Sequence, residues 1–381
     1  MNNLNKNILI IAGEDSGDLH GASLINELKK IDSNINIFGI GGDKMKAAGM
    51  HLIYHVNKMA FLGFVEVLKH LPFIRRVQKD LIEYVKEKDI KTAVLIDYPG
   101  FNLSIAKKLK KLDIKIVYYI SPQIWAWGAG RIKKIRKVID KMLVVFPFEE
   151  NFYNQSGVNV EFVGHPLLER INDYNFLTKN ELYQKFDLEK DKEILLILPG
   201  SRIHEVEKIL PESIKAAKKI AEEFNMQIVV ACAPNIDDNI FKTARNNDEF
   251  KVVKGYTYDL FKYSTVGIVK SGTSTLEAAL FELPIVIVYK TSYLTYLIGK
   301  RLIRVDNIGM VNIIAEETIV PELIQENVTQ ERVYAELKKI LSDKKLLLSI
   351  KKKLSGIKSK LGTIGASERA ASIIYRFLNE A

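Results

Sequence analysis

The chain has 381 residues, of which 47% are hydrophobic and 27% charged, a composition typical of a soluble globular protein with enough apolar residues for two domain cores. Its single cysteine, Cys232, excludes an internal disulfide framework, and the lack of a long apolar run or a signal peptide predicts a cytoplasmic protein. The net charge of +10 favours an anionic partner, namely a phosphate group, a nucleic acid or an anionic membrane surface, although a lysine-rich composition explains it equally well.

Apolar, β-branched runs alternate with amphipathic segments along the first half of the chain. The predicted strands are residues 7–12, 36–40, 92–97, 115–120, 141–145 and 160–163. The predicted helices are residues 17–30, 43–48, 65–88, 102–112, 130–138 and 149–155. This alternation is typical of a parallel sheet with helices on both faces.

The same alternation begins again at residue 194, after a polar stretch. The predicted strands are residues 194–198, 227–232, 250–254, 266–270 and 284–289. The predicted helices are residues 205–224, 239–245, 256–263, 273–281, 293–301, 329–342 and 367–379. In both halves a strand gives way to a polar turn and then a helix, which is how a doubly wound α/β domain opens. We therefore predict two Rossmann-like domains facing a cleft, at residues 1–168 and 193–363, joined by a linker at 169–192 and followed by a final helix at 364–381.

Asp97 is the candidate catalytic residue. It ends the apolar strand 92–97, and the Pro99-Gly100 pair that follows favours a turn. Ligands of open α/β sheets bind beyond the carboxyl ends of the strands, so a carboxylate here is expected to face a ligand. Capping a helix or pairing with a basic group is the structural alternative, and we favour catalysis over it.

A small-residue loop and an arginine predict an anion-binding site in the second half. The loop follows strand 266–270 and opens a helix with Ser271, Gly272, Thr273, Ser274 and Thr275. Small side chains let a phosphate approach the N–H groups of a helix N-terminus, and Glu277, one turn later, can accept hydrogen bonds from a ribose. Arg202, after strand 194–198, suits bidentate contact with a diphosphate. Ser274 and Glu277 also fit the spacing of a helix capping box, and both roles are compatible.

The first turn of the chain, in contrast, is acidic. Its candidate site residues are Glu14, Ser16, Gly17 and Asp18. The turn lacks the Gly-Lys-Ser/Thr of a P-loop, and its carboxylates would repel a pyrophosphate. Sugar hydroxyls are therefore the expected ligands.

Two stretches mix apolar, aromatic and basic residues. Residues 59–84 contain more apolar side chains than one helix face can bury, which favours contact with lipid or a membrane surface. The residues assigned to this surface are Phe61, Leu62, Phe64, Leu68, Leu71 and Phe73, with Arg75 and Arg76. For residues 289–304, a core helix with a basic outer face is an equally good interpretation.

Six motifs occur in order along the whole chain. They are Gly13-Glu14-x-Ser16-Gly17-Asp18, Ile96-Asp97-x-Pro99-x-Phe101-Asn102, Tyr119-x-Ser121-Pro122-Gln123-x-Trp125-Ala126-Trp127, Phe162-x-Gly164-His165-Pro166, Leu198-Pro199-Gly200-Ser201-Arg202-x-x-Glu205 and Ser271-Gly272-Thr273-x-Thr275-Leu276-Glu277. Together they closely resemble the lipid-A-disaccharide synthases, a family of inverting glycosyltransferases with the GT-B fold. The chain departs from the family at Gly100, where many members have a second aspartate, which leaves Asp97 as the carboxylate carried over.

The resemblance implies a fold, a reaction and a set of site residues. In the GT-B fold the last helix packs back on the N-terminal domain. The implied reaction transfers 2,3-diacylglucosamine from UDP-2,3-diacylglucosamine to 2,3-diacylglucosamine 1-phosphate (lipid X), with inversion and release of UDP. Asp97 would take the proton of the acceptor 6-hydroxyl. Arg202, Glu277, the small-residue loop and Asn312 would hold UDP. Ser121, Gln123 and Trp125, with the acidic first turn, would contact the acceptor sugar.

The resemblance also implies what the protein binds. No metal and no cofactor are expected, since the helix N-terminus and Arg202 can meet the charge of the leaving group. The expected partners are the two lipid substrates and the anionic cytoplasmic face of the inner membrane, with no nucleic acid. A homodimer is left open.

Other classes of function remain as alternatives. A UDP-GlcNAc 2-epimerase or a muramyl glycosyltransferase would share a UDP site, but the first needs no acceptor and the second should have a glycine-rich first turn. A non-enzymatic lipid-binding protein would need neither Asp97 nor Arg202.

Overall fold

The computed structural model describes residues 6–59, 71–126, 128–242, 250–292, 296 and 306–379. The chain forms two compact units. Unit 1 combines Met1–Arg170 with Leu361–Ala381, and unit 2 is Ile171–Lys360. The predicted helix 293–301, apart from Tyr296, lies outside the described residues, as do residues 65–70 and 243–245 of two other predicted helices.

Unit 1 contains a seven-stranded parallel sheet in the order β3-β2-β1-β4-β5-β6-β7. Its strands are β1 (Asn7–Ala12), β2 (Asn36–Gly41), β3 (His51–His55), β4 (Thr92–Ile96), β5 (Lys115–Tyr119), β6 (Lys141–Val144) and β7 (Val160–Phe162). Strand order reverses at β1 and β4, which pair with Ala12 opposite Ile96. Such a reversal opens a crevice at the carboxyl ends of the two strands.

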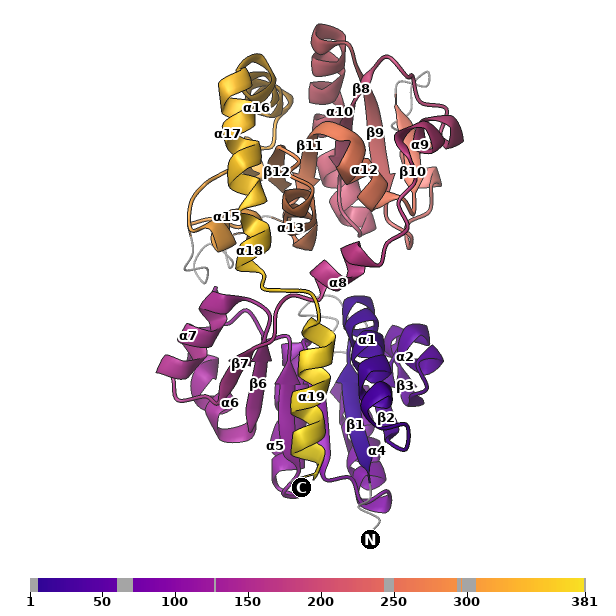
Figure 1. Ribbon diagram of the computed structural model, residues 1–381, viewed down its shortest axis with the longest axis vertical. Coiled ribbons are helices and arrows are strands. Elements are labelled where there is room, and N and C mark those ends of the chain that lie inside the picture. Colours follow the sequence, from indigo (N-terminus) through magenta and orange to yellow (C-terminus); the bar gives the residue numbers. More distant parts are fainter. Residues whose placement is uncertain are drawn as a thin grey trace. The chain divides into compact units, whose positions relative to one another are not determined.

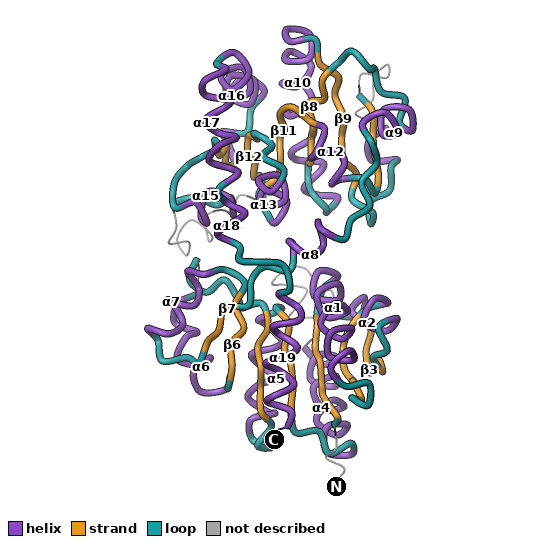
Figure 2. The backbone as a smooth tube through the Cα atoms, viewed as in Figure 1, coloured by secondary structure: helices purple, strands orange, loops and turns teal. Residues whose placement is uncertain are grey.

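Helices cover both faces of this sheet, because its central strands are apolar on both sides and fully buried (Figure 2). The helices are α1 (Asp15–Ile31), α2 (Asp43–Ala47), α4 (Leu71–Glu87), α5 (Pro99–Lys110), α6 (Ile132–Val138), α7 (Pro147–Gln155) and α19 (Ala366–Asn379), with 3₁₀ turns at Val56–Lys58 and Ala129–Arg131. Buried residues of α4, α5, α6 and α7 join one core cluster. Figure 1 shows α1 and α19 side by side on one face, and α19 also contacts β4 and β5. The last helix therefore packs on the N-terminal sheet, as expected.

Polar contacts fix the start of α19 within unit 1. The Glu169 carboxylate accepts hydrogen bonds from the backbone N–H (2.8 Å) and Oγ (2.7 Å) of Ser367. Arg369 donates its Nε hydrogen to the carbonyl oxygen of Val163 at 2.8 Å. These contacts join the chain end to the segment that follows β7.

Unit 2 repeats the plan with a six-stranded parallel sheet in the order β10-β9-β8-β11-β12-β13. Its strands are β8 (Glu193–Leu198), β9 (Met226–Cys232), β10 (Lys251–Lys254), β11 (Ser264–Lys270), β12 (Ile285–Tyr289) and β13 (Glu322–Ile324). Its helices are α9 (Lys179–Lys185), α10 (Ile203–Phe224), α11 (Asn239–Lys242), α12 (Thr257–Tyr263), α13 (Thr273–Leu280), α15 (Met310–Ala315), α16 (Gln330–Ser342), α17 (Lys344–Ser355) and α18 (Ile357–Lys360), with a 3₁₀ turn at Gln325–Asn327. Strand order reverses here at β8 and β11. Both sheets are therefore doubly wound, as predicted.

Several elements were not predicted from the sequence, namely β3, β13, α15, α17 and α18. The short helix α8 (Leu167–Asn172) spans the division between the units. Among the described residues, no helix is both long and apolar enough to cross a membrane.

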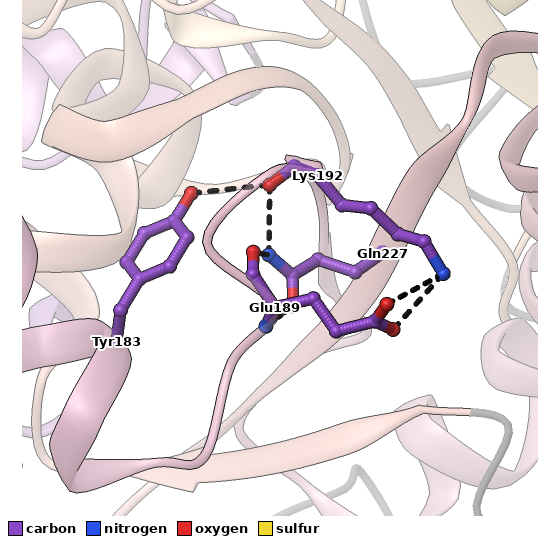
Figure 3. Close-up of polar contacts among 4 residues, drawn as sticks. All are labelled: Tyr183, Glu189, Lys192 and Gln227. Carbon is purple, nitrogen blue, oxygen red and sulfur yellow. Dashed lines mark hydrogen bonds and ion pairs between the residues drawn. The ribbon is translucent and has the colours of Figure 1, made fainter.

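Residues 171–192, predicted as part of a linker, belong to unit 2. Figure 3 shows how the end of this segment is bound to the start of β9 through Gln227. The Gln227 amide donates to the carbonyl oxygens of Glu189 and Lys192, both at 2.8 Å, and accepts from the N–H of Glu189 at 2.9 Å. Tyr183, on α9, donates its hydroxyl hydrogen to the same Lys192 carbonyl at 3.3 Å. These hydrogen bonds hold the end of the segment against unit 2.

Candidate active site

The turns after β1 and β4 place two predicted site residues at the switch point of unit 1. Glu14 follows β1, and Asp97 follows β4 directly. The strands pair in register up to Ala12 and Ile96, so both turns leave the sheet at the same level. The structure thus brings the acidic first turn beside the candidate base.

The backbone around Asp97 is strained, and neighbouring groups hold it in place. Asp97 and Tyr98 both have left-handed conformations, with φ of 44° and 46°, which disfavour residues other than glycine. The Asp97 carbonyl oxygen accepts hydrogen bonds from the Asn102 side-chain amide (2.8 Å) and the Tyr118 hydroxyl. The Asp97 N–H donates to the Tyr119 carbonyl at 3.1 Å. Since three groups hold the backbone of Asp97, the position from which its carboxylate extends is fixed as well.

The Asp97 carboxyl is half-buried, and its pKa is raised from 3.8 to about 6. Burial is the main cause, and the negative charge of Glu14 adds to it. A carboxylate with a pKa close to neutral remains mostly ionised at pH 7 and accepts a proton more readily than an ordinary aspartate does. This environment suits a general base.

Gly13 allows the Tyr98 ring to lie against the first turn. A Cβ atom on Gly13 would lie 2.1 Å from Cδ1 of Tyr98, so no larger residue fits while the ring keeps its place. The Tyr98 hydroxyl donates to the Met59 carbonyl at 2.8 Å. The ring therefore links the β1 turn, the β4 turn and residue 59.

The acidic turn divides into exposed and buried residues. Glu14 and Ser16 are exposed, whereas Gly17 and Asp18 are buried. The Asp18 carboxylate accepts hydrogen bonds at the amino end of α2, from the N–H groups of Gly42 (2.6 Å), Lys44 (3.1 Å) and Met45 (3.0 Å). The structure thus gives Asp18 a structural role inside unit 1, and of the four predicted site residues in this turn Glu14 and Ser16 are the exposed ones.

A buried carboxylate holds the predicted acceptor loop that follows β5. Glu149, on α7, accepts hydrogen bonds from Ser121 Oγ (2.7 Å) and Trp125 Nε1 (3.0 Å) through the same oxygen. Its other oxygen accepts from the backbone N–H of Phe146 at 3.2 Å. Burial raises the pKa of Glu149 to about 7, although these hydrogen bonds oppose the rise. Gln123 lies exposed between the two anchored side chains.

At the switch point of unit 2, one buried carboxylate forms ion pairs with two cationic side chains. Glu205 Oε1 lies 2.9 Å from Lys270 Nζ and 3.4 Å from Arg202 Nη1, and Oε2 accepts from the Ser201 N–H at 3.1 Å. Burial alone would raise the pKa of Glu205, but Lys270, Arg202 and the Ser201 N–H outweigh burial and keep it below its usual value. The turns after β8 and β11 are therefore joined by an ionised network.

The small-residue loop opens α13 as predicted, but its capping differs from the prediction. The helix begins at Thr273 with Gly272 as its N-cap, so Ser274 lies inside the first turn, and the predicted capping box of Ser274 and Glu277 is wrong. Ser271 instead donates its hydroxyl to the Ile308 carbonyl at 2.9 Å. Thr273 is exposed, and the first-turn N–H groups have no side-chain cap.

Two predicted UDP ligands have partners inside unit 2. Glu277 is half-buried and accepts a hydrogen bond from the Tyr258 hydroxyl at 3.1 Å. Asn312 is fully buried. Its amide donates to the Val320 carbonyl (2.8 Å) and the Glu322 carboxylate (2.7 Å), and its oxygen accepts from the Ile319 N–H (2.9 Å). Asn312 thus holds Glu322, which accepts hydrogen bonds from the N–H groups of Ile308 and Gly309 in the loop that bonds Ser271.

The predicted membrane surface is described only in part. Phe61, Leu62, Phe64 and Leu68 lie outside the described residues. Of the rest, Arg75 and Arg76 are exposed, and Leu71 and Phe73 are half-buried. The Phe73 ring meets Tyr54 edge-on, with centroids 6.1 Å apart, and packs against the core. Residues 71–76 of α4 are thus partly core and partly basic surface.

Glu149 and Lys270 are the residues that the sequence analysis missed. Glu149 was assigned only to the start of a helix and Lys270 only to the end of a strand. Lys270 had a usable signal, because it precedes the small-residue loop directly at a strand end. Within the ranges described, no three His, Cys, Asp or Glu side chains are grouped so that they could hold a metal ion.

Two doubly wound units, each with polar residues at its switch point, define the fold class of GT-B glycosyltransferases and related epimerases. Solved structures agree. MnaA of S. aureus with UDP has a TM-score of 0.69 at 13% identity, covering 98% of this chain and 97% of that one. UDP-GlcNAc 2-epimerase from Neisseria meningitidis scores 0.66 at 12% identity, over 98% and 100%. The calicheamicin glycosyltransferase CalG4 scores 0.63 at 13%, over 98% of each chain.

Sequence comparisons identify the family within this fold class. The family model described as lipid-A-disaccharide synthetase matches residues 8–374. A lipid-A-disaccharide synthase of Geobacter metallireducens is 40% identical over 99% of this chain and 98% of its own length. That of Syntrophus aciditrophicus is 42% identical over 96% of each chain. The chain belongs to the lipid-A-disaccharide synthetase family.

Proposed function

We propose that the protein transfers 2,3-diacylglucosamine from UDP-2,3-diacylglucosamine to the 6-hydroxyl of 2,3-diacylglucosamine 1-phosphate. The products are the β-1′,6-linked disaccharide 1-phosphate and UDP. Family membership over nearly the full chain supports the reaction. The observation that carries the mechanism is Asp97, a half-buried carboxylate at the switch point with a pKa raised to about 6.

In this mechanism Asp97 takes the proton of the 6-hydroxyl while the oxygen attacks the anomeric carbon of the donor. The bond from that carbon to the UDP oxygen breaks in the same step, so the configuration inverts without a covalent enzyme intermediate. The electron pair of the broken bond stays on the β-phosphate of UDP. Arg202 and the uncapped N–H groups at the start of α13 stabilise this charge, and no metal ion is required.

The acceptor sugar is assigned to unit 1 and the nucleotide to unit 2. Glu14 and Ser16 are exposed in the turn after β1, where the charge of Glu14 acts on Asp97, and Gln123 is exposed on the loop anchored by Glu149. In unit 2, Arg202, the loop 271–275 and Glu277 receive the UDP. The exposed Arg75 and Arg76 at the start of α4 support peripheral attachment to an anionic membrane, from which both acylated substrates must come.

A mass-spectrometric assay of Asp97→Asn tests the assignment of the base. With both substrates in detergent micelles, wild type is expected to form disaccharide, and the variant is expected to lose at least about a hundredfold in rate, the contribution of a general base. Asp113→Asn is the matched control, because Asp113 is an exposed aspartate before β5, at the opposite end of the sheet.

The outcomes separate the assignments. Equal rates of disaccharide formation by wild type and Asp97→Asn would show that the protein catalyses the transfer but that Asp97 is not the general base. Turnover of UDP-GlcNAc without an acceptor would show that the protein is a 2-epimerase rather than a transferase.

A further inference from the structure

Lys270 lies at the point in unit 2 where an anionic ligand is expected. It is the last residue of β11, and its side chain is 18% exposed. Its Nζ lies 3.9 Å from the position that a Cβ atom on Gly272 would take, so it stands beside the N-cap of α13. A cation next to the N-terminus of a helix creates a strongly positive local potential.

Glu205 fixes this ammonium against the turn after β8. One of its oxygens contacts Lys270 Nζ at 2.9 Å, and the other accepts from the Ser201 N–H at 3.1 Å. Gly200 makes this possible, because a Cβ there would lie 2.6 Å from Glu205 Oε2. The carboxylate neutralises one of its two cationic neighbours, Lys270 and Arg202, and leaves one positive charge in excess.

We propose that Lys270 is a second cationic ligand of the donor diphosphate and that Glu205 is the residue that positions it. The proposal rests on the proposed function, in which unit 2 binds the UDP moiety. An ammonium has three N–H donors, so Lys270 is able to donate to a phosphate oxygen and keep its contact with Glu205. As the bond to the anomeric carbon breaks, the electron pair moves onto the β-phosphate, and Lys270 stabilises that charge without giving up its proton.

Lys270 and Arg202 differ in how strongly water screens them. The Lys270 side chain is 18% exposed and the Arg202 side chain 42%. Attraction between charges strengthens as the surroundings become less like water, so the less exposed ammonium is expected to contribute at least as much as the guanidinium.

Calorimetric titration of the full chain with UDP and with uridine tests this role. Wild type should bind UDP more tightly than uridine. Lys270→Met should weaken UDP binding about ten- to a hundredfold, as expected for loss of a charge-assisted contact, and leave uridine binding within about twofold. Lys270→Arg should retain more UDP affinity than Lys270→Met. In the transfer assay, kcat should fall for Lys270→Met, since the contact strengthens as charge develops.

Two further variants keep the test decisive. Lys270→Met/Glu205→Gln removes both charges, so no unpaired carboxylate is left buried, and it should show the same selective loss of UDP affinity. Lys338→Met is the control, because Lys338 forms a lysine–glutamate pair with Glu223 at 2.7 Å on the surface of the same unit. It should bind as wild type does.

Each contrary result has a separate meaning. UDP binding within about twofold of wild type in folded Lys270→Met and in the double variant would overturn the role of Lys270 and leave the proposed function intact. An equal loss of UDP and uridine affinity would show a merely structural lysine and also overturn it. Wild type that binds neither ligand would refute the donor site of the proposed function, and this inference with it.

Discussion

Replacing Asp97 by asparagine should slow transfer at least about a hundredfold and stabilise unit 1 at neutral pH. The folded protein raises the pKa of this carboxyl from 3.8 to about 6, so the fold favours the protonated form. The stabilisation from that form is fully present below about pH 4 and is lost as the pH rises through about 6. At pH 7.5 the ionised carboxylate therefore destabilises the folded state by about 3 kcal/mol at most, since one pKa unit corresponds to about 1.4 kcal/mol.

Asparagine has the shape of aspartate but does not ionise, so the variant escapes this cost. We expect its free energy of unfolding to exceed that of wild type by about 1–3 kcal/mol at pH 7.5, with the difference approaching zero near pH 4. Urea unfolding followed by tryptophan fluorescence reports on unit 1 specifically, because both tryptophans of the chain, at positions 125 and 127, fall within it.

Asp113→Asn replaces an exposed aspartate of the same unit and is the matched control for this measurement. Asp97→Asn could instead change the free energy of unfolding equally at pH 7.5 and near pH 4, or it could destabilise the protein at pH 7.5. Either result would show that the fold does not raise the pKa of Asp97, and the explanation of its basicity would fail.

Three other expectations follow from the site. Tryptophan fluorescence of wild type should titrate with a midpoint near pH 7, because ionisation of Glu149, whose pKa is about 7, changes the hydrogen bond that Trp125 donates. Glu149→Gln should abolish this titration, and an unchanged titration curve in the variant would exclude Glu149 as its origin. Gly200→Ala should destabilise unit 2 by more than about 2 kcal/mol in thermal unfolding, since φ is 130° and the new methyl group would meet Glu205; an unchanged melting temperature would show that the turn relaxes freely. Exhaustive treatment with a metal chelator should leave the transfer rate unchanged, and a loss restored by added Mg²⁺ would contradict catalysis by side chains and helix N-termini alone.

The sequence predicted what short-range patterns determine. Buried parallel strands are continuous apolar runs, so nearly all of the central strands could be recognised. Asp97 directly follows such a run and Arg202 lies in the turn after one, which is why their places beyond the carboxyl ends of β4 and β8 could be anticipated. The edge strand β3, His51–His55, was missed because its sequence is short and its side chains are exposed or only half-buried, so it lacks an apolar run.

The partners of the site residues could not be predicted, because they depend on tertiary contacts. Glu149 meets Ser121 across 28 residues, and Lys270 meets Glu205 across a strand crossover. Nothing in the local sequence of Glu149 distinguishes it from the ordinary acidic residue of a first helical turn. The predicted cap at Ser274 is wrong because the N-cap of α13 is Gly272, two residues before the serine that the capping pattern indicates.

Transfer to the lipid acceptor is tested by measuring UDP and disaccharide in the same reaction. The wild-type chain is incubated with UDP-2,3-diacylglucosamine, once with and once without 2,3-diacylglucosamine 1-phosphate. Transfer predicts UDP and β-linked disaccharide 1-phosphate in equal amounts, and neither product without the acceptor. Release of UDP that does not depend on the acceptor, or no disaccharide from protein that binds UDP, would contradict the transferase assignment.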